Sequence, residues 1–285
     1  MKKVFNIFLV LSFTTSLFFM GCRKKETVEV DNETQSAVDN AVADQEYMSI
    51  VPSVNGHAIN TKGTGGNRMT FAIAPPCDTL TLISGDTLFT NPASYPVYTM
   101  NISSSACANT MPDGRVRGGK MQIKLTGKIK NAGSKMIITM INYNAAGISY
   151  SCDSMVVKTI SSSTFATTFN VKLYKGVCQN ANWNIKYELD RTITFYPKGN
   201  PVNTDPVAEI YGTTNGVNRV GKAFTVVIPQ ATPLVKHKLC KWIDKGIFEL
   251  TPDGFKTRTV DFGDGTCDNK ATFTVNGSTV AFTLN

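Results

Sequence analysis

Cysteine thiols are the side chains with the clearest chemistry in this chain, because two thiols that meet in an exported protein oxidise to a disulfide. The chain contains seven cysteines, one at the end of an N-terminal apolar segment and the others beyond it. The even number beyond that segment suits a disulfide framework, although six thiols allow 15 pairings. These cysteines are Cys77, Cys107, Cys152, Cys178, Cys240 and Cys267.

A turn between two stretches of strand-forming residues predicts one of these pairs. Residues 251–254 read Thr-Pro-Asp-Gly, a combination that favours a tight turn. A hairpin folded about this turn brings Cys240 opposite roughly residue 267. We therefore expect a disulfide between Cys240 and Cys267.

Weaker signals predict the other two pairs. The same folding test about Asn91–Ser94 brings Cys77 opposite Cys107. The turn nearest the midpoint between Cys152 and Cys178 is several residues off centre, so that pair follows mainly by elimination. Free buried thiols are the alternative. Metal binding is not expected, because the sequence has no CxxC spacing and only two histidines.

The sequence offers no local pattern for catalysis. The two histidines, His57 and His237, lie in unrelated surroundings and are expected to be exposed, and no GxSxG elbow is present. The acidic run Asp261–Thr266 suggests calcium, but it departs from the EF-hand spacing and predicts a turn instead. Paired carboxylates for glycoside hydrolysis are not marked by any local pattern. We expect neither an enzyme nor a cofactor, with a hydrolase as the alternative.

The two tryptophans are candidates for contact with sugars, which bind to flat exposed rings. Trp242 lies two residues from Cys240, where an aromatic ring commonly packs over a disulfide, so a core position is expected. A core position is also the expectation for Trp183. Its alternative, a ligand-binding platform, makes Trp183 the candidate binding residue of the chain.

The N-terminus has the pattern of an export signal. Lys2 and Lys3 precede the apolar run Val4–Met20, which has 17 residues and is diluted by five polar ones. A span across a bilayer needs about 18 or more apolar residues, so a signal peptide fits better than a transmembrane helix. The run ends in Phe19-Met20-Gly21-Cys22, which resembles the lipobox of bacterial lipoproteins. This resemblance implies that residues 1–22 form a signal peptide and that Cys22 carries fatty acyl chains such as palmitate, which anchor the protein. An uncleaved anchor and ordinary secretion are the alternatives.

The rest of the chain divides by composition. Residues 23–33 are polar and predict a tether. Residues 34–51 predict a short helix, because a modest apolar stripe runs through them and no proline or glycine occurs before Pro52. Residues 69–285 predict a β-rich domain, as one unit or as two packed halves of about 69–200 and 201–285.

The β-rich region predicts an all-β fold. Short stretches rich in Val, Ile, Thr, Tyr and Phe alternate with turn residues at fairly regular spacing. Lys120–Thr126 alternates apolar and polar residues, and Asn276-Gly277 favours a type I′ hairpin turn. We predict an antiparallel meander of about 12–14 strands with one short N-terminal helix. Its arrangement as a curved sheet, a sandwich or a partial barrel is left open.

The charge is basic without being extreme. The formal net charge of +8 becomes about +6 once Lys2 and Lys3 are removed with the signal peptide. This balance fits anionic envelope surfaces or acidic glycans, and equally an ordinary soluble surface. Nucleic acid is not an expected partner, because the basic residues are scattered over many strands.

Four segments of the chain are similar to a family of uncharacterised lipoproteins from Bacteroidota. They are Leu239-Cys240-Lys241-Trp242, Arg258–Ala271, Gln35–Asn40 and Asp113–Lys120. The resemblance implies a periplasmic or outer-membrane lipoprotein and implies no reaction.

Together these features predict a non-enzymatic lipoprotein of the cell envelope, anchored in the outer membrane through its lipid. Its partners are then the membrane and either a glycan or another envelope protein. The alternatives are a polysaccharide-binding surface lipoprotein, a fimbrial or adhesin subunit that exposes a strand edge, and a hydrolase.

Overall fold

The computed structural model describes residues 31, 33–60, 79–102, 115–200, 205–238, 240 and 242–283, without the side chains of residues 53 and 55–60. The chain divides into the units Met1–Asn32 and Glu33–Asn285, and the architecture below belongs to the second. The expected signal peptide with Cys22, most of the 23–33 tether and the expected pair Cys77–Cys107 lie outside the described residues.

An antiparallel β-sheet with one α-helix makes up the described fold, which confirms the predicted all-β class. The helix is α2 (Gln35–Asn60), and a 3-10 turn, η1 (Pro92–Ser94), joins the first two strands. The strands are β1 (Thr79–Ser84), β2 (Val97–Ile102), β3 (Arg117–Leu125), β4 (Lys135–Ala145), β5 (Ile148–Ser151), β6 (Ser154–Ser162), β7 (Thr167–Gln179), β8 (Asn184–Tyr196), β9 (Val207–Val217), β10 (Ala223–Ile228), β11 (Leu234–His237), β12 (Lys245–Pro252), β13 (Arg258–Asp264), β14 (Lys270–Val275) and β15 (Ser278–Thr283).

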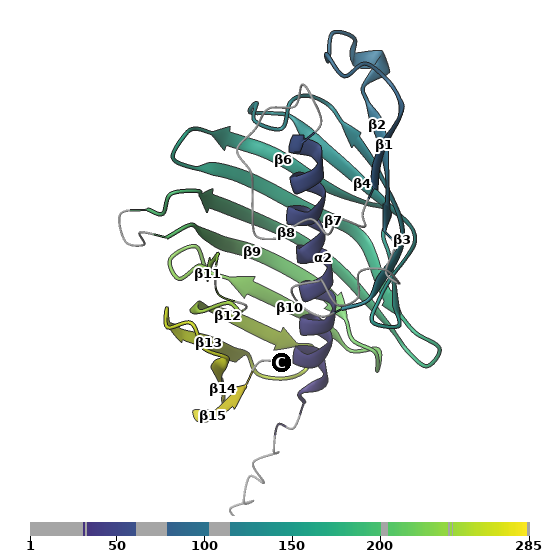
Figure 1. Cartoon of the computed structure of the whole chain (residues 1–285). Helices are drawn as coiled ribbons and strands as arrows, with labels where there is room; N and C mark the ends of the chain where they lie inside the picture. Colours follow the sequence, from purple (N-terminus) through teal and green to yellow (C-terminus); the bar gives the residue numbers. More distant parts are fainter. Residues whose placement is uncertain are drawn as a thin grey trace, which may run out of the picture. The chain divides into compact units, whose positions relative to one another are not determined.

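The strands follow one another across a single sheet in chain order (Figure 1). β5 and β6 both lie between β4 and β7, and β10 and β11 both lie between β9 and β12, so the 15 strands occupy 13 positions. This agrees with the predicted meander. No ladder joins β1 to β15 among the described residues, so the sheet is open, and the curved sheet is the arrangement observed.

The sheet continues without a break across the boundary expected between two halves near residue 200. β8 and β9 pair along eleven consecutive residues, from Lys186 opposite Val217 to Tyr196 opposite Val207. The residues on both sides of that boundary therefore belong to one sheet.

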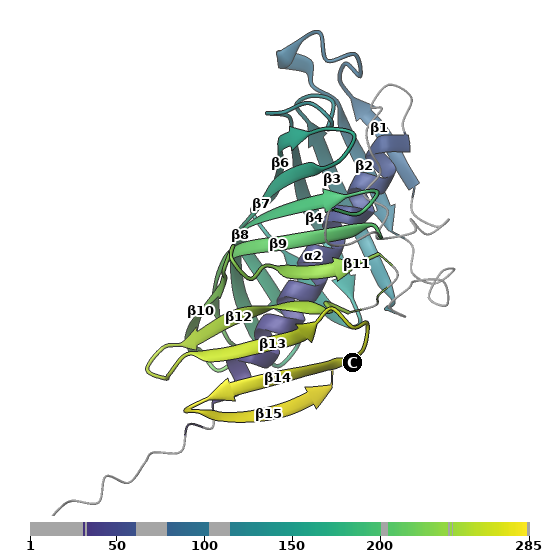
Figure 2. The same cartoon turned by 90° about the vertical axis from the view of Figure 1, so that its left-hand side faces the viewer.

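Helix α2 lies along the concave face of the sheet (Figures 1 and 2). It buries a stripe of apolar side chains whose spacing of three or four residues places them on one face of the helix. The buried stripe consists of Ala43, Tyr47, Ile50, Val51 and Val54.

The sheet meets this stripe with every second residue of its strands, as a pleated strand requires. On β8 the inward residues are Ile185, Tyr187, Leu189, Arg191, Ile193 and Phe195, all buried. The core therefore lies between the helix and the concave face.

The helix is longer than expected. It continues through Pro52 to Asn60, which corrects the expected end at Val51. A proline inside a helix removes one backbone hydrogen bond and costs about 3 kcal/mol. Ile50, Val51 and Val54 are buried on both sides of Pro52, and the burial of these side chains against the sheet outweighs that cost. In the part of the chain that the structure describes, no helix is long and apolar enough to cross a membrane.

Two of the predicted turns are confirmed. Asn276 and Gly277 have φ angles of 53° and 73°, the positive values of a type I′ turn, and they connect β14 to β15. The turn after Thr251 connects β12 to β13, and the predicted disulfide between Cys240 and Cys267 is formed, with 5.6 Å between the Cα atoms. It ties the segment before β12 to the connection between β13 and β14.

The expected disulfide between Cys152 and Cys178 is not formed, and both are free thiols. The register explains this correction, because Tyr150 lies opposite Cys178 and Cys152 lies two residues further along, past the end of β5. Burial is the main cause that raises the pKa of each thiol to about 12. Both thiols therefore stay protonated near neutral pH and react slowly.

Replacing Cys240 and Cys267 together with serine should lower the free energy of unfolding by about 3 to 4 kcal/mol, because a bond that closes a loop of this size restricts the unfolded chain. The two cysteines are 27 residues apart. Urea unfolding of the wild type and of the double variant, each with and without a reductant, measures the effect and separates this bond from any other disulfide that the reductant breaks. Cys152→Ser is the control and should respond to the reductant as the wild type does. An unchanged wild-type midpoint in reductant would contradict the expectation.

Candidate functional site

Acidic residues of α2 and of the segment just before it each meet arginine side chains from the sheet. The carboxylates belong to Glu33, Asp39, Asp44 and Glu46, and the arginines are Arg115, Arg117, Arg191, Arg219 and Arg258. We call this set of nine residues the helix clamp. We treat it as the candidate site, because five of its members are buried: Asp39, Glu46, Arg117, Arg191 and Arg258.

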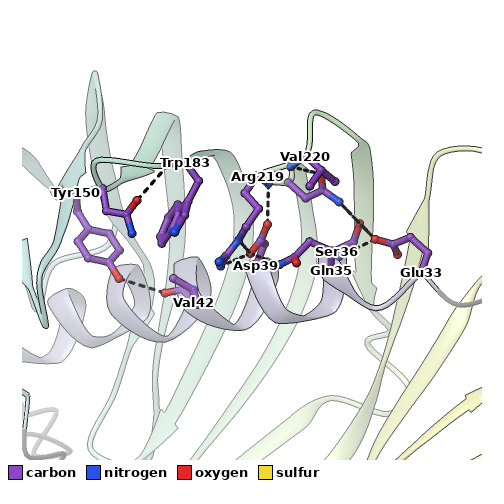
Figure 3. A network of polar contacts seen from close by, with 11 residues as sticks. Glu33, Gln35, Ser36, Asp39, Val42, Tyr150, Trp183, Arg219 and Val220 are labelled. Atoms are coloured by element: carbon purple, nitrogen blue, oxygen red, sulfur yellow. Dashed lines mark hydrogen bonds and ion pairs between the residues drawn. The ribbon is translucent and has the colours of Figure 1, made fainter.

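Arg219 joins the connection between β9 and β10 to the first half of the helix (Figure 3). Its backbone N–H and its Nε each donate to a carboxylate oxygen of Asp39 at 2.7 Å. The side-chain amide of Gln35 donates to the same carboxylate at 2.9 Å. Because Asp39 is fully buried, these donors replace the water that its charge would otherwise need.

The same arginine covers Trp183, the candidate ligand-binding residue. The guanidinium carbon of Arg219 lies 4.3 Å from the centre of the indole ring, which is a cation–π contact. The ring is half-buried and packs against the hydrophobic core. One face of Trp183 is therefore occupied within the protein and is not open to a sugar.

The start of the helix is held by Glu33 and its neighbours. The backbone N–H and the hydroxyl of Ser36 donate to Oε1 of Glu33 at 2.9 and 3.0 Å, which satisfies one of the free N–H groups at the helix N-terminus. The side-chain amide of Asn218 donates to the hydroxyl of Ser36 at 3.0 Å. From β13, Nε of Arg258 donates to the carbonyl of Glu33 at 2.9 Å.

In the second half of the clamp, three sheet side chains contact the carboxylate of Glu46. Nε of Arg117 donates to the carboxylate of Glu46 at 2.9 Å, Arg115 adds a contact at 3.3 Å, and the hydroxyl of Tyr143 donates to the same carboxylate. The side chain of Glu46 has no exposed surface. Burial and the carboxylate of Glu46 together raise the pKa of Tyr143 well above its ordinary value.

Arg191 is the arginine that comes from the middle of the sheet. It lies 2.7 Å from the carboxylate of Asp44 and donates to the hydroxyl of Thr214 at 2.9 Å. Tyr187 donates to Asp44 at 2.8 Å. Although burial disfavours the charged form, the carboxylate of Asp44 holds the pKa of Arg191 above its ordinary value. The guanidinium therefore stays charged inside the protein.

Tyr47 fastens the middle of the helix to the sheet without using charge. Its hydroxyl donates to the carbonyls of Ser151 and Val177, at 2.8 and 3.1 Å. Burial raises the pKa of Tyr47 far above its ordinary value. Gly176 leaves room for this side chain, because a Cβ there would lie 3.0 Å from the tyrosine oxygen and 2.6 Å from the carbonyl of Tyr187.

A second polar cluster lies beside the disulfide. His237, expected to be exposed, has only 22% of its side chain exposed, and its Nδ1 lies 2.7 Å from the buried carboxylate of Asp244. Lys236 donates to the carbonyl of Cys240 at 2.8 Å and to that of half-buried Trp242 at 3.3 Å. Burial lowers the pKa of Lys236 to about 8. The side chain of His57, in α2, lies outside the described residues.

The run Asp261–Thr266 is not the predicted turn, because Asp261–Asp264 form the end of strand β13, where its register with β12 shifts. Asp261 accepts a hydrogen bond from the N–H of Gly263 at 2.8 Å, and Asp264 accepts from the N–H of Thr266 at 3.0 Å. Among the described side chains, no group of three or more His, Cys, Asp or Glu could hold a metal ion. The hydrogen bonds from Thr266 lower the pKa of Asp264.

The helix clamp was not predicted from the sequence. The available signal was Arg191, which falls in the same alternating set of β8 positions as Leu189 and Ile193. A charged residue at an inward position needs a buried partner of opposite charge. This pattern therefore predicts an acidic residue on the element that packs against β8.

No family model, curated protein or solved structure matches the chain.

Glu46→Gln should lower the free energy of unfolding by about 3 to 5 kcal/mol, because it leaves the buried guanidinium of Arg117 without its counter-charge. Asp190→Asn is the matched control. Its ion pair with Lys172 is about half exposed, at 48% and 42% of the two side chains, and such pairs contribute only about 0 to 1 kcal/mol. Urea unfolding of both variants at neutral pH tests this, and equal losses would contradict a structural role for the clamp.

The lowered pKa of Lys236 should make stability depend on pH. The folded protein loses this proton near pH 8, whereas an unfolded lysine keeps it until about pH 10.4, so stability rises with pH between these values. We expect the free energy of unfolding of the wild type, relative to Lys236→Met, to rise by up to about 3 kcal/mol between pH 7.5 and 10.5. A difference that stays flat with pH in urea titrations would show that the amine titrates normally.

Proposed function

We propose that this protein is a non-enzymatic structural or binding component of the cell envelope, held at the outer membrane by a lipid on Cys22. The observation that carries the proposal is that the buried charged groups are engaged in contacts with one another. The carboxylates and arginines of the helix clamp contact one another and hold the helix on the sheet. Groups bound in this way contribute to stability and are not free to act on a substrate.

Three kinds of observation support the location. Lys2, Lys3 and the apolar run that ends at Gly21-Cys22 have the pattern of a lipoprotein signal. The disulfide between Cys240 and Cys267 fits an oxidising compartment, since such bonds are rare in the cytosol. The similarity of four segments to uncharacterised lipoproteins of Bacteroidota points in the same direction. The partners under this proposal are the membrane and an envelope protein or glycan.

The contacts of Trp183 favour a structural role over polysaccharide binding. A sugar platform needs an open aromatic face, and here Arg219 occupies one face of the ring while Asp39 holds the arginine in place. Removing that cover would break a buried ion pair, which makes the uncovered state costly.

An assembly subunit is the second candidate function, and the exposed outermost strand favours it. All six residues of β15 are exposed, from Ser278 to Thr283. A strand edge of this kind is the surface that strand-addition complexes use.

Lipidation should be visible as incorporation of labelled palmitate in a bacterium that processes lipoproteins. The wild type should carry the label and fractionate with the outer membrane, because two or more acyl chains anchor a protein stably. Cys22→Ser should carry no label, and Cys152→Ser, a matched loss of another cysteine, should be labelled like the wild type. Wild-type protein that keeps Met1 and stays in the soluble fraction would overturn the proposed anchoring.

A further inference from the structure

The outermost strand β15 has one neighbour in the described sheet, β14, along a ladder of six pairs from Lys270 opposite Thr283 to Val275 opposite Ser278. A strand with one neighbour presents a row of N–H and C=O groups on its other side. These groups are able to pair with a further strand. The sheet is therefore open to extension at this end (Figure 2).

β15 lacks the devices that usually protect a sheet edge, which are charged residues, proline and bulges. Its sequence, Ser-Thr-Val-Ala-Phe-Thr, contains neither a charge nor a proline, and its register with β14 is unbroken. The opposite edge differs. β1 has a register shift between Leu82 and Ser84 where it pairs with β2, and such a bulge disturbs further pairing.

The apolar inner face of the described sheet continues to this edge, where its last side chain is exposed. Phe248, Val260, Phe273 and Val280 are successive partners across β12, β13, β14 and β15. Val260 is 4% exposed and Val280 is 60% exposed, so the row begins in the core and ends in solvent. An apolar row that ends this way gains burial if the sheet is extended.

We propose that β15 pairs antiparallel with β15 of a second copy of this chain, about a two-fold axis at Ala281. The interaction extends the sheet across two molecules. It goes beyond the proposed function and does not depend on lipidation of Cys22.

The sequence of β15 selects this register. Residues directly opposite each other in an antiparallel pair lie on the same face, and an aromatic residue opposite a β-branched one is a favourable pair. With Ala281 on the axis, Val280 of each copy lies opposite Phe282 of the other. With Val280 on the axis, Phe282 would lie opposite Ser278 and the apolar contact would be smaller.

Two copies can approach each other at this edge without strong charge repulsion, although the whole chain is basic. Between residues 270 and 283 the only charged side chain is Lys270, at the far end of the hairpin from the turn. It pairs with Thr283 of its own molecule. A two-fold interface of this kind is closed, because each copy uses the same strand and no edge of that type is left over.

Cysteine cross-linking of the full-length protein in intact cells tests both the contact and its register. Ala281→Cys should form a disulfide-linked dimer under mild oxidation, because opposite Cβ atoms lie about 4.5 to 5.5 Å apart. In this register Thr279 of one copy lies opposite Thr283 of the other. Thr279→Cys and Thr283→Cys should therefore form no disulfide-linked dimer when each is expressed alone, and should form one when the two variants are co-expressed. The wild type controls for the native cysteines, and Thr81→Cys on β1 controls for chance collisions. Equal cross-linking of Thr81→Cys and Ala281→Cys would overturn the proposal.

Sedimentation of the purified full-length protein in detergent tests the energetics. Val280→Lys should raise the dimer dissociation constant at least tenfold, because two like charges would enter an apolar row. Val227→Lys is the matched control, since Val227 is 42% exposed on the interior strand β10, and it should leave the constant unchanged. A wild type that is monomeric at every concentration tested would refute pairing between copies. So would a wild type that purifies in a stable complex with a different protein bound at β15.

Discussion

Burial of charge is the constraint on which the described fold depends. A carboxylate taken out of water costs several kcal/mol unless a counter-charge and hydrogen-bond donors replace its hydration. The fully buried Asp39 and Glu46 meet this requirement at the connection between β9 and β10 and at strand β3, and Asp44, 26% exposed, adds a contact with strand β8. Sliding or rotating the helix would break all three contacts together, so the ion pairs define its position more strictly than apolar burial alone would.

Placing a helix on the concave face allows an open sheet to have a core. A single curved sheet without a second layer would leave its inner residues in water, and here Tyr47 and Ile50 of the helix fill that space. The helix covers one face of the sheet. Because the described sheet does not close on itself, it ends in two outermost strands, β1 and β15, each with an edge that has no neighbouring strand in the described sheet.

The parts of the fold that could be predicted rest on local chemistry. The period-two alternation of strands, the Asn276-Gly277 turn and the turn after Thr251 depend on neighbouring residues alone, and the Cys240–Cys267 bond follows from that second turn. The end of the helix beyond Pro52 and the separation of Cys152 from Cys178 could not be predicted in the same way. Burial against the sheet and the register of β5 with β7 decide them.

The sequence by itself determined an all-β class, the approximate number of strands and one disulfide, because these follow from side-chain periodicity and turn residues over short distances. Only the tertiary structure decided that the sheet is open, that the helix lies within its curve and that Arg117 meets Glu46, 71 residues away in the chain. The physical reason is that a buried charge selects its partner by position in space. The spacing of residues along the chain does not contain that position until the sheet has formed.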